Sequence, residues 1–343
     1  MRFFNFFTQE LAIDLGTANT LIIQGDQIVV DEPSIVAIDR KSGETIAVGQ
    51  KAMQMHEKTH ENIKTIRPLK DGVIADFQAA ENMIEGFIRM TGARRRFFTH
   101  LKMVICIPSG ITEVEKRAVF ESADHVDSKE TYLIHEPMAA ALGIGLDVEE
   151  PVGNMIIDIG GGTTEIAVIA LSGIVCDQSI RIAGDELTMD IVNYMKRQHN
   201  ILIGERTAEQ IKIHVGSALP ELDNAPDDFA VNGRDLMTGI PKQITVGYSE
   251  IAHALDKSIS KIEDAVLKAL ESTPPELAAD IYKTGLYLTG GGALLRGLDK
   301  RISAKTKLPV SVANDPLRAV VRGTGIALKN THKFTFLIDR KRV

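Results

Sequence analysis

Two glycine-rich turns constrain this chain more than any other feature of its sequence. They are Asp14-Leu15-Gly16-Thr17-Ala18-Asn19-Thr20 and Asp158-Ile159-Gly160-Gly161-Gly162-Thr163-Thr164. Each turn lies between two short runs of apolar, strand-favouring residues, such as residues 11–15 before the first turn and 166–171 after the second. We therefore expect each turn to join two antiparallel strands and to offer backbone N–H groups to an anion. Because the pattern occurs twice, we expect both turns to face the same anion.

These turns differ from the two common phosphate-binding motifs. A dinucleotide-binding fold would lead from the glycines into a helix, and a Walker loop would need Gly-Lys-Ser/Thr, which neither turn contains. Neither turn has a lysine, so the phosphate charge must be balanced by amide dipoles and by a metal ion that Asp14 and Asp158 could hold through water. For either turn alone, a plain tight turn between strands is the alternative.

Three further segments are rich in small residues. Residues 136–145 and 318–328 predict helices whose alanines and glycines would let two helix backbones approach closely. We expect these two helices to cross between two similar halves of the chain. Residues 286–295 predict a strand, a glycine turn and a helix, and such a turn can lie flat against a nucleotide base or ribose.

Length and apolar spacing are those of a two-domain globular protein. At 343 residues the chain is long for a single core. Apolar residues at helical spacing predict a helix at 77–90, another after 249, and a strand at 103–107. No apolar run approaches the ~20 residues of a membrane span.

Net charge and cysteine content indicate which partners and which redox compartment the sequence favours. The net charge of −7 argues against a nucleic-acid partner. The two cysteines, Cys106 and Cys176, lie in apolar, strand-like runs and cannot form a disulfide scaffold. We expect both to be buried thiols in a reducing compartment.

In this order, the five glycine- and alanine-rich segments resemble those of the actin, Hsp70 and sugar-kinase ATPase superfamily, over nearly the whole chain. Within this superfamily, the residues at 14–20, 136–141, 158–165 and 289–294 are most similar to the motifs of the MreB family of bacterial actins. The resemblance implies an α/β, actin-like fold of two similar domains, each with a mixed sheet flanked by helices, and a nucleotide in the cleft between them.

The resemblance also implies where the two domains begin and end. The first domain would comprise residues 1–142 plus 316–343, with a small insert at about 30–74. The second would comprise residues 143–315, with a small insert at about 180–240.

The resemblance assigns roles to individual residues. Glu136 and Thr163 would polarise the water that attacks the γ-phosphate, although a carboxylate at the start of a helix also suits the helix macrodipole without any catalysis. Asp14 and Asp158 would orient water bound to Mg²⁺. ATP, with GTP left open, would be bound by the following residues: Thr17, Ala18, Asn19, Gly161, Gly162, Thr163 and Thr164 at the phosphates, and Glu209, Gln210, Ile211, Lys212, Gly291, Gly292, Ala293 and Leu294 at the ribose and adenine.

Two features near this site have open interpretations. Glu209 and Lys212 lie three apart on a predicted helix at 207–215, where they either reach one ligand or form an ordinary i,i+3 ion pair. His135 stands where the family often has a second acidic residue. We hypothesise that it perturbs Glu136 and makes hydrolysis slower or pH-dependent.

Two aromatic segments favour a membrane surface. If residues 1–11 are helical, four phenylalanines occupy an arc of roughly 160° that either packs on the protein or lies in a membrane interface. A signal peptide is disfavoured because the apolar stretch is short and lacks a small-residue cleavage site. In the second segment, three arginines at 94–96 precede two phenylalanines. Basic residues beside aromatic side chains suit an anionic leaflet, although a basic loop capping a helix is the alternative. The aromatic residues are Phe3, Phe4, Phe6, Phe7, Phe97 and Phe98.

Three function classes fit these motifs. The first is a filament that assembles with ATP and is remodelled by slow hydrolysis. An Hsp70-type chaperone would need a peptide-binding domain after the ATPase, where this chain has only a short tail, and a sugar kinase would need an aspartate base that we cannot assign. The resemblance therefore implies a bacterial cytoskeletal protein on the inner face of the cytoplasmic membrane. Its implied partners are further copies of itself in paired protofilaments, anionic lipid, a transmembrane linker and the cell-wall elongation proteins that control rod shape.

Overall fold

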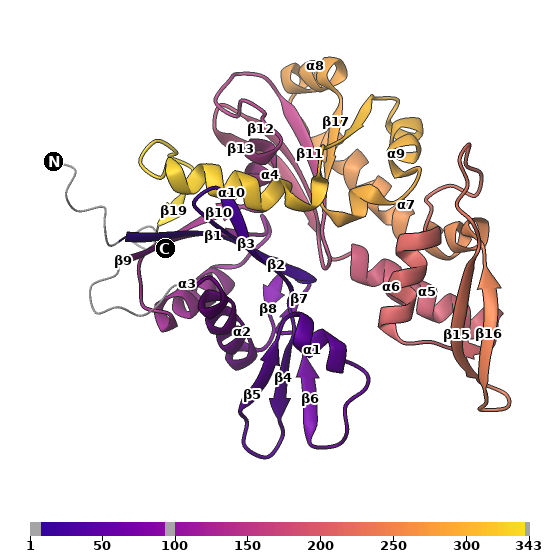
Figure 1. Ribbon diagram of the computed structural model, residues 1–343. Helices are drawn as coiled ribbons and strands as arrows, with labels where there is room; N and C mark the ends of the chain where they lie inside the picture. Colours follow the sequence, from indigo (N-terminus) through magenta and orange to yellow (C-terminus); the bar gives the residue numbers. More distant parts are fainter. Residues whose placement is uncertain (1–7, 93–99, 340–343) are drawn as a thin grey trace.

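The computed structural model describes residues 8–92 and 100–339. Two sheets dominate it, one in each half of the chain (Figure 1). The first sheet has the strand order β19-β10-β9-β1-β2-β3. Its strands are β1 (Thr8–Leu15), β2 (Asn19–Gln24), β3 (Gln27–Pro33), β9 (His100–Ile107), β10 (Ser128–His135) and β19 (Ile338–Asp339).

The second sheet repeats the plan of the first. Its order is β13-β12-β11-β17-β18, from β11 (Asn154–Ile159), β12 (Thr164–Ala170), β13 (Gly173–Ile180), β17 (Leu286–Thr289) and β18 (Val310–Val312). In both sheets three antiparallel strands are followed by strands in parallel pairing, β1 with β9 and β11 with β17. Both predicted hairpins, β1–β2 and β11–β12, are confirmed as antiparallel pairs.

Helices α4 (Glu136–Gly143) and α10 (Ala319–Lys329) lie between the two sheets, as Figure 1 shows. One buried cluster joins them to both sheets, with Val104 from the first and Ile156 from the second. A Cβ atom on Gly143 would overlap the carbonyl oxygen of Ala319, and one on Gly323 would overlap that of Ala139. The predicted close crossing of two small-residue helices is therefore confirmed.

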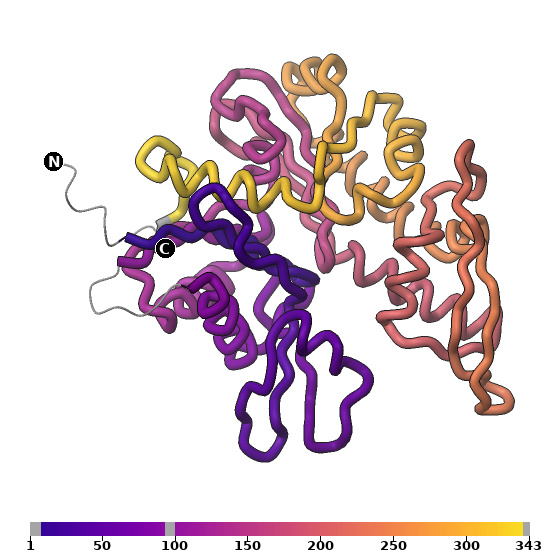
Figure 2. The backbone as a smooth tube through the Cα atoms, viewed as in Figure 1, coloured from indigo at the N-terminus to yellow at the C-terminus, as the bar shows by residue number. Residues whose placement is uncertain are grey.

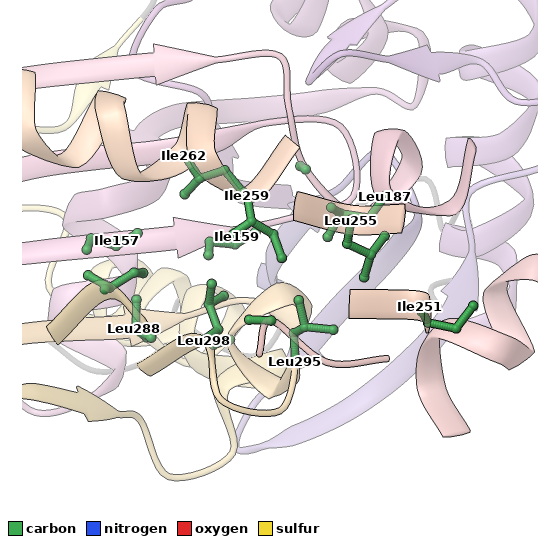
Figure 3. Packing of buried hydrophobic residues seen from close by; sticks show 14 of the residues in the cluster. Ile157, Ile159, Leu187, Ile251, Leu255, Ile259, Ile262, Leu288, Leu295 and Leu298 are labelled. Atoms are coloured by element: carbon green, nitrogen blue, oxygen red, sulfur yellow. The ribbon is translucent and has the colours of Figure 1, made fainter. Parts of the chain in front are cut away.

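The outer faces of the two sheets are covered by the remaining long helices. Helices α2 (Phe77–Met90) and α3 (Glu113–His125) cover the first sheet. The core beyond the second sheet includes residues of α5 (Gly184–Gln198), α6 (Glu205–Val215), α7 (Tyr248–Ser272), α8 (Pro275–Thr284) and α9 (Leu298–Thr306). Figure 3 shows α7 placing Leu255, Ile259 and Ile262 against strand residues such as Ile159. The predicted helices at 77–90 and after 249 are confirmed.

Each half also carries a small three-stranded sheet at its outer end, visible as separate lobes of the tube in Figure 2. In the first half it consists of β5 (Thr45–Val48), β4 (Val36–Asp39) and β6 (Ile63–Ile66), with α1 (Gln50–Met55) packed on it. A short hairpin of β7 (Leu69–Lys70) and β8 (Val73–Ile74) follows. In the second half the small sheet consists of β14 (Ile201–Leu202), β15 (Phe229–Asp235) and β16 (Pro241–Val246).

Some predictions fail or fall outside the described residues. A helix over residues 1–11 is wrong for 8–11, which belong to β1, because this segment pairs with both β2 and β9. Cys106 is buried as predicted, but Cys176 is only partly buried; both are free thiols. The membrane residues Phe3, Phe4, Phe6, Phe7, Phe97 and Phe98 lie outside the described residues. In the part of the chain that the structure describes, no helix has the length and apolarity needed to cross a membrane.

Candidate functional site

The two glycine turns, one from each half, pack against each other. A Cβ atom on Gly161 would lie 3.0 Å from the backbone nitrogen of Ala18, and one on Gly162 would lie 2.7 Å from Thr17 Oγ1. Side chains at 161 and 162 would therefore push the turns apart. The second turn is closed by a hydrogen bond of 2.9 Å from the Gly160 N–H to the Thr163 carbonyl. The two predicted anion-binding turns thus lie in direct contact.

A third turn, which the sequence analysis missed, joins them. Asp71 and Gly72 connect β7 to β8, with φ of 53° and 79°. The Gly72 N–H donates to Thr17 Oγ1 at 3.0 Å, and a Cβ atom on Gly72 would lie 2.9 Å from Thr163 Cγ2. An Asp-Gly pair between short strand-like segments is a hairpin signal, so the turn could have been found from sequence, but not its contact with both loops.

Three carboxylates named from the sequence converge beneath these turns. Burial raises the pKa of Asp14 to about 6, although a hydrogen bond of 3.1 Å from Cys106 Sγ lowers it in part. Burial raises the pKa of Asp158 to about 7, against the opposing effect of a 2.8 Å hydrogen bond from Thr289 Oγ1. The pKa of Glu136 lies well above its ordinary value, because of burial first and then of the charges of Glu165, Asp158 and Asp14. The site therefore gathers three carboxyl groups whose ionised forms are disfavoured by burial and, for Glu136 and Asp158, by neighbouring carboxylates.

This donor set fits a Mg²⁺ ion held through water. Carboxylate oxygens are the ligands that Mg²⁺ prefers, and it commonly keeps several waters beside one or two carboxylates and substrate phosphates. Within residues 8–92 and 100–339, no three His, Cys, Asp or Glu side chains gather closely enough to hold a metal ion by themselves. Asp14 and Asp158 are thus suited to orienting metal-bound water rather than to forming a complete protein cage.

The hypothesis that His135 perturbs Glu136 is not supported by the charges at the site. His135 is not among the groups that shift the pKa of Glu136. Burial lowers the pKa of His135 itself, so its ring is neutral near pH 7. Its Nδ1 lies 3.3 Å from the Pro108 carbonyl oxygen, and a carbonyl only accepts, so Nδ1 carries the proton.

The residues of α6 lie on different sides of the helix. Lys212 Nζ and Glu209 Oε2 form an i,i+3 ion pair at 2.7 Å, which was one of the two interpretations that the sequence left open. Lys212 Nζ also donates to the Gly184 carbonyl at 2.8 Å and to Thr188 Oγ1 at 3.0 Å. Since the Gly184 N–H donates to the Gly160 carbonyl, this lysine lies beside the second glycine turn.

The other two α6 residues that were predicted to bind nucleotide differ from each other in exposure. Gln210 is exposed, whereas Ile211 is completely buried in the core of the second half. The side chain of Ile211 is therefore a packing residue. Thr188, which the sequence analysis did not single out, donates to Glu209 Oε2 at 2.6 Å and fixes the ion pair to α5.

The predicted adenosine segment follows β17. A short 3-10 helix, η2 (Gly291–Leu294), begins where β17 ends, and the last residue of β17, Thr289, is the register partner of Asp158. Ala293 is buried and Leu294 is about half exposed. Gly291, Gly292 and Ala293 are thereby placed at the same end of the second sheet as the second glycine turn.

Comparison with known proteins identifies the family. A family model described as MreB/Mbl protein matches residues 8–335. The chain is 48% identical over 328 residues to the cell shape-determining protein Mbl of Bacillus subtilis, covering 95% of this chain and 98% of the relative. It is also 48% identical over 333 residues to the cell shape-determining protein MreB of Escherichia coli, covering 96% of this chain and 95% of the relative. The chain belongs to the MreB/Mbl family.

Solved structures give the same result for the fold. The crystal structure of MreB 5 of Spiroplasma citri bound to AMPPNP superposes with a TM-score of 0.90 and 39% identity, over 95% of this chain and 97% of that one. The same protein bound to ADP gives a TM-score of 0.89. MamK, solved as a double helical filament, is 20% identical with a TM-score of 0.78 over 95% of this chain and 99% of that one, and shows the fold alone. The predicted actin-like fold is confirmed.

Proposed function

We propose that this chain is a nucleotide-dependent cytoskeletal filament protein that binds and slowly hydrolyses ATP. In this proposal it assembles on the inner face of the cytoplasmic membrane and directs cell-wall elongation and rod shape. The observation that carries the proposal is the direct contact of two glycine turns above Asp14, Asp158 and Glu136 in a chain of the MreB/Mbl family. The relatives are named cell shape-determining proteins, and MreB 5 binds AMPPNP and ADP.

In the proposed mechanism, backbone amides of both turns bind the phosphates. Thr17 to Asn19 and Gly161 to Thr164 would supply these N–H groups, with Lys212 adding positive charge beside the second turn. Mg²⁺, when bound, would neutralise phosphate charge. Asp14 and Asp158 would hold it through water, and its presence would favour their ionised forms.

Hydrolysis is assigned to Glu136 and Thr163. A raised pKa makes ionised Glu136 a better proton acceptor than an ordinary carboxylate, so it can take a proton from the attacking water. The Thr163 hydroxyl, on the opposite half of the site, would hold that water in line with the γ-phosphate. Glu209, Gln210 and the backbone of Ile211, with Gly291 to Leu294, would border the ribose and base of ATP, and GTP remains an alternative.

Membrane binding is proposed from where the two aromatic segments join the fold. Thr8 and His100 are register partners in β1 and β9. Residues 1–7 and 93–99 therefore join the first sheet at the starts of two adjacent, parallel strands. Four phenylalanines in the first segment, and three arginines followed by two phenylalanines in the second, suit an anionic leaflet.

Self-assembly is proposed from family membership, which favours a filament over a chaperone or a sugar kinase. MamK, with the same fold, is solved as a double helical filament. Repeated end-to-end contacts between identical subunits would form a heterologous interface that does not close. A transmembrane linker and the cell-wall elongation machinery complete the proposed set of partners.

Sedimentation of purified protein with ATP, with ADP and without nucleotide, each with and without anionic liposomes, tests this proposal. We expect filaments to pellet with ATP and to bind the liposomes. A variant lacking residues 1–7, with Phe97 and Phe98 replaced by serine, should still assemble but should no longer float with liposomes. A wild-type chain that stays monomeric with every nucleotide would contradict the filament, and unchanged flotation of the variant would contradict the membrane contact.

A further inference from the structure

A carboxylate buried between the two halves lies outside the residues assigned so far. Glu165 is completely buried, and three hydrogen bonds hold its two oxygens. Its Oε2 accepts from the Ser109 N–H at 3.0 Å and from Ser109 Oγ at 2.5 Å. Its Oε1 accepts from Ser179 Oγ at 2.6 Å. Both oxygens of this buried carboxyl group therefore have hydrogen-bond donors, as a buried polar group requires.

The two serines come from different halves of the molecule. Ser179 lies on β13, next to β12 in the same sheet, and is the register partner of Glu165. Ser109 follows β9 of the first sheet, so its hydrogen bonds cross from the first half to the second. The crossing is tightly packed, because a Cβ atom on Gly110 would lie 3.1 Å from Ser179 Cβ.

The contact between Ser109 and Glu165 lies only a few residues or one hydrogen bond away from each of the two proposed catalytic residues. On the first side, Pro108 precedes Ser109, and its carbonyl accepts from the ring of His135, the residue before Glu136. On the second side, Glu165 lies two residues after Thr163 at the start of β12. Glu136 and Thr163 belong to opposite halves, so their separation depends on how these halves are joined at this point.

We propose that Glu165 is a positioning residue for ATP hydrolysis, which uses the Ser109 contact to hold Glu136 opposite Thr163. This inference rests on the proposed ATPase function and deepens it. Glu165 does not touch the reacting atoms in this account; it fixes the distance between the water-activating groups of the two halves. A small displacement of such groups costs far more in rate than in binding.

The charge of Glu165 supports the same role. Among the charged groups around Glu136, Glu165 makes the largest contribution to the raised pKa of that residue. Glu165 thus stands close enough to the proposed catalytic carboxylate for the two side chains to interact. Replacement by glutamine keeps the size of the side chain and removes this charge.

Two serine variants form a matched pair for the test. Ser109→Ala and Ser179→Ala each remove one hydroxyl from the same carboxylate, but only the first removes a contact between the halves. We expect Ser109→Ala to lower kcat for ATP hydrolysis about tenfold with KM changed less than twofold. Ser179→Ala should lower kcat less than twofold. Glu165→Gln should lower kcat at least as much as Ser109→Ala.

A rescue variant separates positioning from general damage to the fold. Ser109 lines a cavity of about 310 Å³ that it shares with Met138 and Phe336, so the added methyl group of Ser109→Thr has room. This variant keeps a hydroxyl group and should recover most of the lost kcat. Equal losses in Ser109→Ala and Ser179→Ala, no loss in either, or a loss expressed in KM alone would overturn the positioning role.

The wild type and Glu136→Ala distinguish this inference from the proposed function. If the wild type hydrolyses ATP, Glu136→Ala does not, and the serine variants behave like the wild type, only the positioning role of Glu165 is overturned. If the wild type binds ATP without hydrolysing it, the ATPase function fails and the positioning role fails with it.

Discussion

Two of the regions where the halves of this molecule meet have opposite character. At the base, α4 and α10 cross so closely that the backbones of Gly143 and Gly323 touch the opposite helix, in an apolar cluster shared by both sheets. At the outer end, the contacts are polar. The Glu205 N–H donates to Glu57 Oε1 at 3.1 Å, and Arg67 Nη1 lies 3.5 Å from Asp185 Oδ1.

The difference indicates which region can open. Close-packed backbones allow only one arrangement, since any separation leaves buried apolar surface without a partner. The outer contacts are partly exposed, with 30% of the Arg67 side chain and 42% of the Asp185 side chain accessible, and such ion pairs contribute about 0–1 kcal/mol. We infer that the helix crossing is a fixed axis and that the outer contacts form and break as nucleotide binds between them.

The largest expected effect comes from disrupting the packing of α10 against α4. Gly323→Ala should destabilise the fold by several kcal/mol, because its Cβ would overlap the Ala139 carbonyl of α4. Urea unfolding measures this. Gly325→Ala in the same helix is the control, since its Cβ would meet nothing closer than 3.5 Å, and alanine is favoured over glycine in a helix by up to about 1 kcal/mol. Equal stabilities for the two variants would contradict a close-packed axis.

The second-largest expected effect concerns ATP hydrolysis, which we assign to a site between these two regions. Glu136→Gln should lower kcat for ATP hydrolysis by about a hundredfold, because it removes the proton acceptor, while nucleotide affinity changes little. Single-turnover hydrolysis and equilibrium binding of ATP measure the two quantities separately. Full activity of the variant would show that the water is activated by another group.

A third, smaller effect is a pH dependence of stability in the protein without nucleotide or divalent cation. The pKa of Asp158 rises from 3.8 to about 7 in the folded chain, so between these values the folded state binds more protons than the unfolded state. The contribution of this group to stability therefore falls as pH rises through that window, by at most about 1.4 kcal/mol per pH unit.

Thermal unfolding of the wild type and Asp158→Asn between pH 4.5 and 7.5 isolates this contribution. We expect the gain in stability of the variant relative to the wild type to increase with pH up to about 7. Parallel curves for the two proteins would show that Asp158 is ionised throughout.

The smallest expected effect is at the outer contacts. Arg67→Ala should speed nucleotide dissociation a few-fold at low salt, with less effect at high salt and no loss of stability, because exposed ion pairs are weak and screened. Arg40→Ala is the control, because Arg40 is exposed and directly follows β4, as Arg67 directly follows β6. Identical dissociation rates for both variants would mean that the outer contacts do not retain nucleotide.

The sequence predicts those parts of the fold that short, local patterns determine. The turns at 14–20 and 158–164 and the small-residue helices have the expected form, because glycine spacing and apolar runs specify them within about ten residues. The first residues of β1, Thr8 to Glu10, were missed because pairing with β9 outweighs the helical spacing of the sequence before them.

The site was predictable only in part, for a related reason. Asp14, Asp158 and Glu136 could be named from their motifs, and they converge. The contacts of Ser109 with Glu165, and of Gly72 with Thr17, join residues more than 50 positions apart and exist only once the two halves are assembled. Similarly, spacing on α6 could not show that Ile211 faces the core while Lys212 reaches Gly184.

Hydrogen exchange of the monomeric wild type, with and without Mg²⁺ and AMPPNP, tests the fixed axis and the opening outer region most directly. At protein concentrations below assembly, we expect nucleotide to slow exchange around residues 56–67 and 204–210. The amides of α4 and α10 should exchange slowly in both states. Nucleotide-dependent protection of α4 and α10 with no change in the outer segments would contradict this account.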